Sequence, residues 1–387
     1  MKHVLFIFGT RPEAIKMAPL VLRFKAEASL KTTVCVTGQH RDMLDQVLKP
    51  FGIRPDIDLD VMRQDQDLFD VTLNILHGLK PILQKLVPDI VFVHGDTTTT
   101  FTASLAAFYC KIRVAHIEAG LRTHNFFSPW PEELNRQLTA RLASYHFAPT
   151  EGARQNLLKE GIRDDQIMVT GNTVIDALHY IQDKIEQNPA LKARLARLLR
   201  DRGYPFPDLK DPRRIVLVTG HRRENFGEGF RNICSALKQI AIEYQDVDVV
   251  YPVHLNPNVR KIVLSMLSNI PNIYLIEPLE YEPFIFLMNA SSIVVTDSGG
   301  IQEEAPSLGK PVLVMRNQTE RPEAVSAGTV RLVGTDPGLI KTVISRLLTD
   351  SAYYASMAQA VNPYGDGKAA NRIFELLQEF IGGERHA

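Results

Sequence analysis

The chain has 387 residues, which is too long for one ordinary hydrophobic core and indicates two domains. Its 44 lysines and arginines balance 44 aspartates and glutamates, so no net charge draws it to nucleic acid or to an anionic membrane. No apolar run approaches the roughly 20 residues of a membrane span, and a strand-like segment stands where a signal peptide would. The three cysteines are far apart in apolar contexts, so we expect a cytoplasmic protein without disulfides or a zinc site.

Short apolar runs alternate with helical periodicity along the chain, a pattern typical of parallel sheets covered by helices. In the first half we expect strands at residues 3–8, 33–37, 90–94, 113–117, 145–148 and 166–170. Gly171 opens a helix that is expected to run into the 190s. The polar segment 200–213 contains three prolines and is the best candidate for a linker.

The second half restarts with a strand at 214–219, and the residues after it resemble those after the first strand. Residues 9–13 read Gly-Thr-Arg-Pro-Glu and residues 220–224 read Gly-His-Arg-Arg-Glu, so both fit Gly-x-Arg-x-Glu. This repetition favours two related α/β domains. Further strands are expected at 248–253, 272–276, 293–296, 312–314 and 330–333, and closing helices at 337–360 and 368–381.

The segment after residue 296 has features of an anion site. Asp297 and Ser298 can cap the following helix, and Gly299 and Gly300 let a ligand approach the backbone closely. A helix N-terminus after a buried strand presents free N–H groups and the positive end of its dipole. Glu304 can accept hydroxyl hydrogen bonds, as from a ribose. The spacing leaves two interpretations open, a nucleotide site or an ordinary strand–turn–helix with solvated charges.

Ligands of open α/β sheets bind beyond the carboxyl ends of the strands, so polar residues at those ends are candidates. In the first domain these are Arg11, Gln39, His40, Asp96 and Glu118, and in the second His221, Arg222, Arg223, His254, Ser298 and Glu304. An acidic residue at a strand end is often only a helix cap, and His94 and His116 lie within apolar runs as core histidines do. No turn carries the Gly-x-Gly-x-x-Gly fingerprint of a dinucleotide site, and metal-ligand spacings are absent.

Glu132 is a further candidate, because Pro131 at a helix start places it in the first turn. There the helix dipole favours the ionised carboxylate that a general base requires.

Several long motifs together resemble one family. They are Gly-Thr-Arg-Pro-Glu-Ala-Ile-Lys at 9–16, His-Gly-Asp-Thr-Thr-Thr-Thr at 94–100, Glu-Ala-Gly-Leu-Arg-Thr at 118–123, Pro-Trp-Pro-Glu-Glu at 129–133, Thr-Gly-His-Arg-Arg-Glu at 219–224, Tyr-Pro-Val-His-Leu-Asn-Pro at 251–257 and the segment 297–325. Over residues 1–381 the chain resembles the bacterial non-hydrolysing UDP-N-acetylglucosamine 2-epimerases.

The resemblance implies two Rossmann-like α/β domains facing a central cleft, as in glycosyltransferase-B folds. The expected organisation is an N-terminal domain (1–172), a connecting helix and linker (173–213), a C-terminal nucleotide-binding domain (214–365) and a final helix (366–387) that packs back on the first domain. The implied reaction converts UDP-GlcNAc into UDP-ManNAc through anti elimination of UDP to 2-acetamidoglucal and syn re-addition. The reaction implied in this way requires neither a nicotinamide cofactor nor a metal. The resemblance also implies a homodimer that supplies ManNAc for the synthesis of surface polysaccharides.

By the same resemblance, Asp96, Glu118, Glu132 and His221 form the catalytic group. We assign Glu118 and Glu132 to proton transfer at carbon 2, Asp96 to sharing or orienting that proton, and His221 to the departing phosphate. The substrate-binding residues are expected to be Arg11, Lys16, Phe284, Ser298, Gly299, Gly300, Glu304 and Arg321. Some relatives bind UDP-GlcNAc as an activator, through residues that match Gln39, His40, Arg222 and His254. The alternatives are a hydrolysing relative, a silent nucleotide-sugar sensor and a glycosyltransferase.

Overall fold

The computed structural model describes residues 1–38, 41–61, 63, 65–206 and 213–382. The chain forms two compact units. Unit 1 comprises Met1–Tyr180 and Tyr364–Ala387, and unit 2 comprises Ile181–Pro363. The first boundary falls inside helix α7 (Thr173–Glu186), and the part of the expected linker that the structure describes, residues 200–206 and 213, belongs to unit 2.

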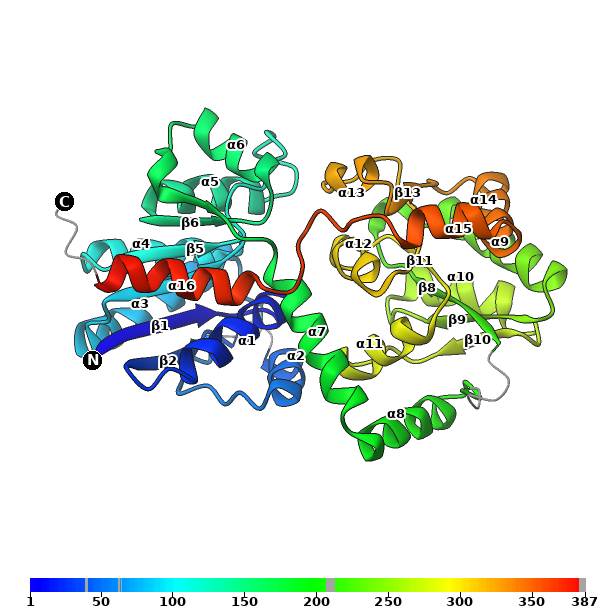
Figure 1. Cartoon of the computed structure of the whole chain (residues 1–387), viewed down its shortest axis with the longest axis horizontal. Coiled ribbons are helices and arrows are strands. Elements are labelled where there is room, and N and C mark those ends of the chain that lie inside the picture. Colours follow the sequence, from blue (N-terminus) through cyan, green and yellow to red (C-terminus); the bar gives the residue numbers. More distant parts are fainter. Residues whose placement is uncertain (39–40, 62, 64, 207–212, 383–387) are drawn as a thin grey trace. The chain divides into compact units, whose positions relative to one another are not determined.

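Unit 1 is built on a seven-stranded parallel sheet with the order β3-β2-β1-β4-β5-β6-β7 (Figure 1). Its strands are β1 (Lys2–Phe8), β2 (Leu30–Val36), β3 (Ile57–Asp58), β4 (Ile90–His94), β5 (Arg113–Ile117), β6 (Tyr145–Ala148) and β7 (Ile167–Val169). Its other helices are α1 (Arg11–Lys25), α2 (Arg41–Leu48), α3 (Leu68–Leu86), α4 (Thr98–Tyr109), α5 (Glu132–Leu142), α6 (Glu151–Lys159) and α16 (Ala369–Gly382).

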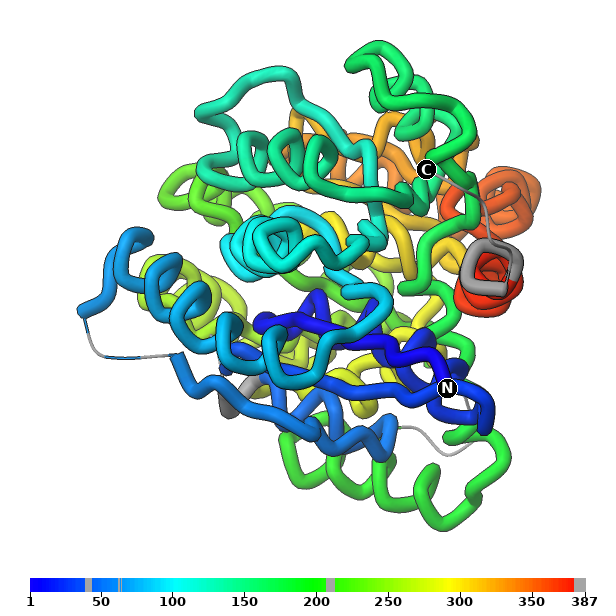
Figure 2. Tube along the Cα trace, turned by 90° about the vertical axis from the view of Figure 1, so that its left-hand side faces the viewer, coloured from blue at the N-terminus to red at the C-terminus, as the bar shows by residue number. Residues whose placement is uncertain are grey.

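Alternate residues of β1 serve two separate layers, because successive side chains of a strand point to opposite faces. Leu5 and Ile7 join the apolar faces of α3 and α4 in one buried cluster. Phe6 stacks on Phe92 of β4 with ring centroids 4.6 Å apart, and Phe24 of α1 packs edge-on against Phe374 of α16. The last helix of the chain therefore completes the layer that α1 begins (Figure 2).

Unit 2 repeats this architecture with a six-stranded parallel sheet in the order β10-β9-β8-β11-β12-β13. Its strands are β8 (Arg214–Thr219), β9 (Val247–Pro252), β10 (Ile273–Ile276), β11 (Ile293–Thr296), β12 (Val312–Val314) and β13 (Val330–Leu332). Its helices are α8 (Pro189–Asp201), α9 (Glu228–Glu243), α10 (Pro257–Leu267), α11 (Tyr281–Ala290), α12 (Gly299–Glu304), α13 (Pro322–Ser326), α14 (Pro337–Thr349) and α15 (Ser351–Ala358). A buried cluster of unit 2 joins α9, α10 and α14 to one face of the sheet.

Every strand expected from the sequence is present, and the structure adds the two-residue edge strand β3. Two expected helices are each divided in two. The helix after Gly171 ends at Glu186, because Pro189 opens α8 and the Asn188 side chain caps it. The helix expected over 337–360 is broken at Asp350, whose side chain accepts the Tyr353 N–H and caps α15. Side-chain capping at these points outweighs the continuous helical periodicity.

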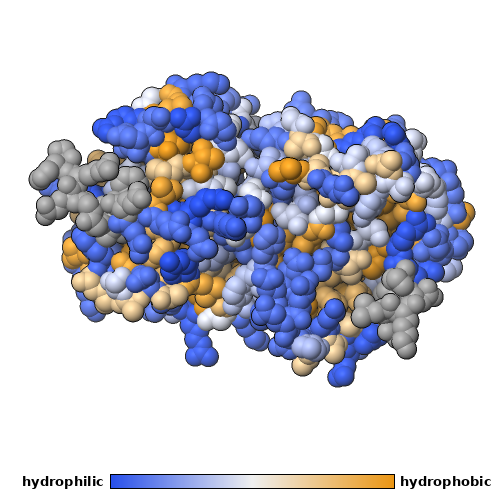
Figure 3. Space-filling model, in the orientation of Figure 1, coloured by the Kyte–Doolittle hydropathy of each residue, from blue (hydrophilic) through white to orange (hydrophobic). Residues whose placement is uncertain are grey.

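No helix in the described ranges has both the length and the apolar character to span a membrane. On the face of the molecule drawn in Figure 3, hydrophilic residues predominate and apolar residues are scattered among them.

Two histidines of adjacent strands are buried in unit 1 and predict acid sensitivity. Burial, with nearby positive charge, lowers the pKa of His116 to about 3 and that of His146 to about 4. Protons therefore bind the unfolded chain better, so the stability from these neutral rings is complete above about pH 6.5 and falls as the pH drops towards 4. Urea unfolding at pH 7 and pH 5 should show the loss, and His146→Leu should reduce its pH dependence. Equal pH dependence in both proteins would contradict the prediction.

Candidate functional site

The strand order of each sheet reverses beside its first strand, at β1/β4 in unit 1 and at β8/β11 in unit 2. The carboxyl ends of strands at such a point are where open α/β sheets bind ligands.

Glu118 follows the end of β5 and is held by three other elements of unit 1. Its Oε2 accepts hydrogen bonds from Nζ of Lys16 on α1 and from Nδ2 of Asn172, the latter at 2.8 Å. Nε2 of His94, the last residue of β4, lies 3.9 Å from the same oxygen. The Glu118 backbone has φ = 61°, a left-handed conformation that is uncommon for a residue with a side chain. The carboxylate is therefore fixed in place rather than free in solvent.

Asp96 lies one turn after β4 and is held from α5. Nη2 of the buried Arg136 donates to its Oδ2 at 2.6 Å, and Nδ2 of Asn135 donates to its backbone carbonyl at 3.0 Å. The following residue, Thr97, is the N-cap of α4 as the sequence predicts, and its hydroxyl accepts the N–H of Thr100. The α5 helix and the β4–α4 turn are thus joined at Asp96.

Glu132 is the first residue of α5. Its Oε2 is buried and has no hydrogen-bond partner in the described part of the chain. Its neighbour Glu133 is fully buried and accepts five hydrogen bonds. The two adjacent carboxylates therefore differ: Glu132 can accept a further hydrogen bond, whereas the hydrogen-bonding capacity of Glu133 is already filled.

The two Gly-x-Arg-x-Glu segments fold differently. Glu13 is buried and accepts from the N–H groups of Gly9 and Thr10 and from two hydroxyls of the α4 N-terminus, and burial raises its pKa. Glu224 instead pairs with Arg316, 2.6 Å away. Of these two glutamates, only Glu13 joins the turn after β1 to the turn after β4. Arg11, the neighbour of this turn, is the first residue of α1.

In unit 2, His221 follows β8 and faces Asp297, which follows β11. Nδ1 of His221 lies 3.1 Å from Oδ1 of Asp297, whose Oδ2 accepts the backbone N–H groups of His221 and Arg222 at 2.9 Å each. Burial alone would raise the pKa of Asp297, but these contacts lower it below its usual value. The His221 ring is stacked on His254 with centroids 5.6 Å apart, and burial together with His221 lowers the pKa of His254.

Asp297 therefore does not cap the next helix, which was one role expected from the sequence. Ser298 is the N-cap of α12, without a side-chain hydrogen bond to it. The oxygens of Asp297 turn back to the β8 end because the two strands are neighbours in the sheet.

The remaining nucleotide-binding candidates lie around α12. The buried Glu304 accepts a hydrogen bond from the Tyr281 hydroxyl at 2.7 Å, and Arg321 contacts Glu303 at 2.8 Å. A Cβ on Gly299 would lie 3.2 Å from Cζ of Arg321, so glycine leaves room for this guanidinium. Gly300 follows within α12, and Phe284 is partly buried on α11. Gln39 and His40 lie outside the described residues.

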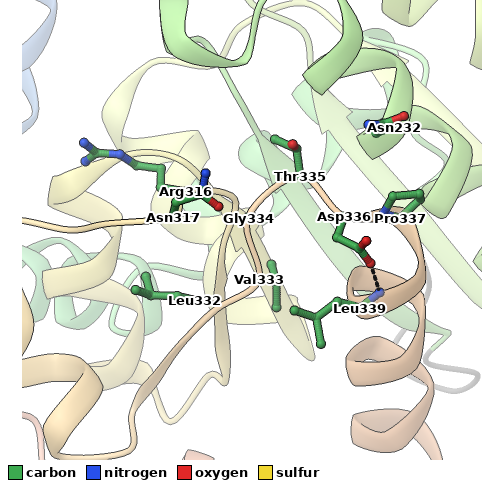
Figure 4. Close-up of a pocket in the computed structure, with 10 residues that line it drawn as sticks. All are labelled: Asn232, Arg316, Asn317, Leu332, Val333, Gly334, Thr335, Asp336, Pro337 and Leu339. Atoms are coloured by element: carbon green, nitrogen blue, oxygen red, sulfur yellow. Dashed lines mark hydrogen bonds between the residues drawn. The ribbon is translucent and has the colours of Figure 1, made fainter.

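A hollow of about 500 Å³ lies at the ends of β12 and β13 (Figure 4). It is lined by Asn232, Arg316, Asn317, Leu332, Val333, Gly334, Thr335, Asp336, Pro337 and Leu339. None of the proposed catalytic or substrate-binding residues lines it. Asp336 caps α14 through the Leu339 N–H, and Arg316 is paired with Glu224 and Glu320, so its charged groups are already engaged. Within the described residues, no three His, Cys, Asp or Glu side chains are grouped as a metal site.

Residues 22–378 match the family model described as UDP-N-acetylglucosamine 2-epimerase. The chain belongs to this family. The UDP-N-acetylglucosamine 2-epimerase of Escherichia coli K12 is 58% identical to it over 375 residues, which is 97% of this chain and 98% of that protein. The Neisseria meningitidis UDP-GlcNAc 2-epimerase, solved bound to UDP-GlcNAc, is 52% identical with a TM-score of 0.88 over 97% of this chain and 100% of that one.

A glycotransferase of kitacinnamycin shares only 11% of the sequence but has a TM-score of 0.65 over 98% of each chain, which shows a common fold. The family, the pair of Rossmann-like parallel sheets and the epimerisation of UDP-N-acetylglucosamine expected from the sequence are thereby confirmed.

Sequence reasoning overlooked several residues that hold the epimerase's acidic groups. These are His94, Asn135, Arg136 and Asn172 in unit 1 and the orienting role of Asp297 in unit 2. Asn172 follows a predicted strand and could have been included by the strand-end criterion. His94 was assigned to the core, but its ring also faces Glu118. Arg136 lies inside a helix, where no spacing rule distinguishes it from a solvated charge.

Proposed function

We propose that the epimerase interconverts UDP-GlcNAc and UDP-ManNAc without net hydrolysis, through loss of UDP to 2-acetamidoglucal and its re-addition. The observation that carries this proposal is the fixed group of carboxylates in unit 1. Glu118 is held by Lys16 and Asn172, and one oxygen of Glu132 has no hydrogen-bond partner among the residues that the structure describes. Inversion at carbon 2 requires proton transfer on both faces of the carbon, hence at least two acid/base groups.

The proposed roles follow from these environments. Glu118 and Glu132 transfer the proton at carbon 2, and Asp96 shares or orients it. His221 acts on the departing phosphate, and the buried Asp297 beside Nδ1 orients its ring so that the imidazole can stabilise or protonate an oxyanion. The proposal needs neither a metal nor a nicotinamide.

The diphosphate and nucleoside would be held by residues that the family resemblance indicates. Arg11, Lys16 and Arg321 supply cations, and the N–H groups of residues 298–300 lie at the start of α12. Glu304, oriented by Tyr281, would accept the ribose hydroxyls, with uracil near Phe284. Lys16 is paired with Glu118 in the structure, so its role would combine orienting that carboxylate with binding phosphate.

Proton NMR of the purified enzyme with UDP-GlcNAc in heavy water tests the function directly. We expect UDP-ManNAc to appear, with deuterium at carbon 2 of both sugars. Accumulation of free ManNAc and UDP would indicate the hydrolysing branch, and an unchanged spectrum despite binding would indicate a sensor. Turnover only after an acceptor is added would indicate a glycosyltransferase.

We further propose that the enzyme is cytoplasmic and that UDP-GlcNAc activates it by binding at Gln39, His40, Arg222 and His254. UDP-ManNAc alone should then react slowly and accelerate when traces of UDP-GlcNAc are added. Coupled assays of initial rate against added UDP-GlcNAc measure this acceleration. A full initial rate with UDP-ManNAc alone would contradict the activator role.

The enzyme is also proposed to be a homodimer that supplies ManNAc for surface polysaccharides. Adjacent helices of unit 1 expose large apolar side chains, namely Phe69 and Leu73 on α3, Phe108 and Tyr109 on α4, and Leu134 and Leu138 on α5. Such a grouping on neighbouring helices is typical of a protein interface. Light scattering should give twice the chain mass, and Leu73→Asp should lower it. A monomeric mass for the unmodified chain would contradict the dimer.

A further inference from the structure

Glu133 is a fully buried carboxylate whose hydrogen-bonding capacity is saturated. Oε1 accepts the His124 N–H at 3.1 Å and Nε2 of Gln137 at 2.9 Å. Oε2 accepts the Thr123 N–H at 3.0 Å, the Thr123 hydroxyl at 3.1 Å and Nη1 of Arg136 at 3.2 Å. Burial alone would raise the pKa of Glu133, but these donors lower it below its usual value. An ionised carboxylate is retained in the interior because every oxygen is paired.

These contacts join two parts of the site. Thr123 and His124 belong to the segment that runs from Glu118 to Glu132, so Glu133 fixes this segment against α5. Arg136 extends the network, because its other terminal nitrogen is 2.6 Å from Oδ2 of Asp96. One buried guanidinium therefore lies between two carboxylates, one saturated and one at the end of β4.

We propose that Glu133 and Arg136 are positioning residues of the epimerase: Glu133 fixes the segment leading to Glu132 and orients Arg136, which in turn holds Asp96. This inference rests on the proton-transfer roles proposed above for Glu132 and Asp96. Neither Glu133 nor Arg136 is assigned to the reacting atoms.

The charge of Glu133 is essential to this arrangement and cannot be replaced by an isosteric amide. A glutamine would place its NH₂ group where either Oε1 or Oε2 now lies. At the first position it would face the His124 N–H, and at the second it would face the Thr123 N–H and Arg136. Donor would meet donor in both orientations, so either the segment or Arg136 must move. A displacement of about 1 Å of a catalytic group costs roughly 100-fold in rate.

The test compares Glu133→Gln with Glu132→Gln and a matched control. Asp176→Asn is the control, because Asp176 is also buried in unit 1 and accepts the N–H groups of Ala369 and Ala370, far from α5 in sequence. We expect Glu133→Gln to lower kcat by about 100-fold with KM for UDP-GlcNAc unchanged, since the proposed nucleotide contacts are untouched. Asp176→Asn should also lower the melting temperature, and it should leave kcat unchanged.

A double-mutant cycle separates positioning from general weakening of the fold. Arg136→Gln should cause a similar loss of kcat, and the double variant should lose little more than either single one, because both act through one network. Normal kcat in Glu133→Gln, with Glu132→Gln inactive, would overturn the positioning role alone. Full activity and proton exchange in Glu132→Gln would instead overturn the proposed catalytic role. If Asp176→Asn lost as much kcat as Glu133→Gln, the effect of Glu133 would be explained by its contribution to the fold alone.

Discussion

Replacing Glu118 with glutamine should lower kcat by about 10²–10⁴-fold and stop deuterium incorporation at carbon 2 of UDP-GlcNAc. This range is the usual contribution of one positioned acid or base. The substitution keeps the size of the side chain and removes its capacity to accept a proton. Because Lys16 and Asn172 both donate to Oε2, the amide oxygen can still occupy that position. The expected loss is therefore chemical rather than positional.

The backbone at Glu118 supports a functional reason for its placement. A left-handed conformation costs a non-glycine residue of the order of 1 kcal/mol, and such residues are concentrated at active sites. Glycine at this position would relieve the strain and abolish activity, so Glu118→Gly and Glu118→Gln should differ in stability and agree in inactivity.

Stability must be measured beside activity, because the substitution also alters a buried ion pair. Lys16 would keep its charge without a carboxylate partner, at a cost of about 3–5 kcal/mol if no water reaches it. Melting curves and NMR exchange on the same preparations separate this cost from the loss of chemistry. A folded Glu118→Gln enzyme that still exchanges the carbon 2 proton at the normal rate would remove Glu118 from the mechanism.

The sequence predicts the sheets well because buried parallel strands have a strong signal. The β-branched run Ile293–Thr296 and the apolar run Ile90–His94 have the expected bounds. The edge strand β3 pairs through only two residues, Ile57 and Asp58, and has no periodicity to detect. The breaks at Asn188 and Asp350 depend on capping hydrogen bonds within otherwise continuous helical patterns.

The sequence predicts only those residues of the site that follow directly from the order of strands and helices. Residues at the ends of strands, such as Asp96, Glu118 and His221, are brought to the sheet edges by topology alone. Some of the partners that hold them, such as Lys16 in α1 and Arg136 in α5, come from helix interiors. Glu132 and Glu133 are indistinguishable by charge and position, but a helix turns about 100° per residue, so only Glu133 meets Arg136 and the Thr123 backbone. This pairing depends on how α5 packs against the rest of unit 1, and no local sequence pattern predicts that packing.

Asp297→Asn should also have a large effect, lowering kcat by about 10²–10⁴-fold through His221. Oδ2 accepts two backbone N–H groups, so the amide oxygen of the asparagine should remain there. Its NH₂ group would then face Nδ1 of His221 where a carboxylate oxygen now lies at 3.1 Å. The ring would have to turn away or present Nδ1 as an acceptor to this donor, so its orientation would no longer be fixed by a carboxylate. Stabilisation or protonation of the departing phosphate should fail.

Asp248→Asn is the matched control for this variant. Asp248 is a second buried aspartate of unit 2, in β9, and accepts from Nε of Arg213 at 2.7 Å and from the Tyr204 hydroxyl at 3.3 Å. It lies near the start of its strand, whereas Asp297 follows the end of β11, so it is remote from the carboxyl edge. Both variants should lower the melting temperature, and only Asp297→Asn should lower kcat. Equal kcat values in the two variants would show that Asp297 merely supports the fold. A selective loss would place the buried carboxylate in the mechanism as the group that orients His221, because the two changes remove the same charge from the same unit.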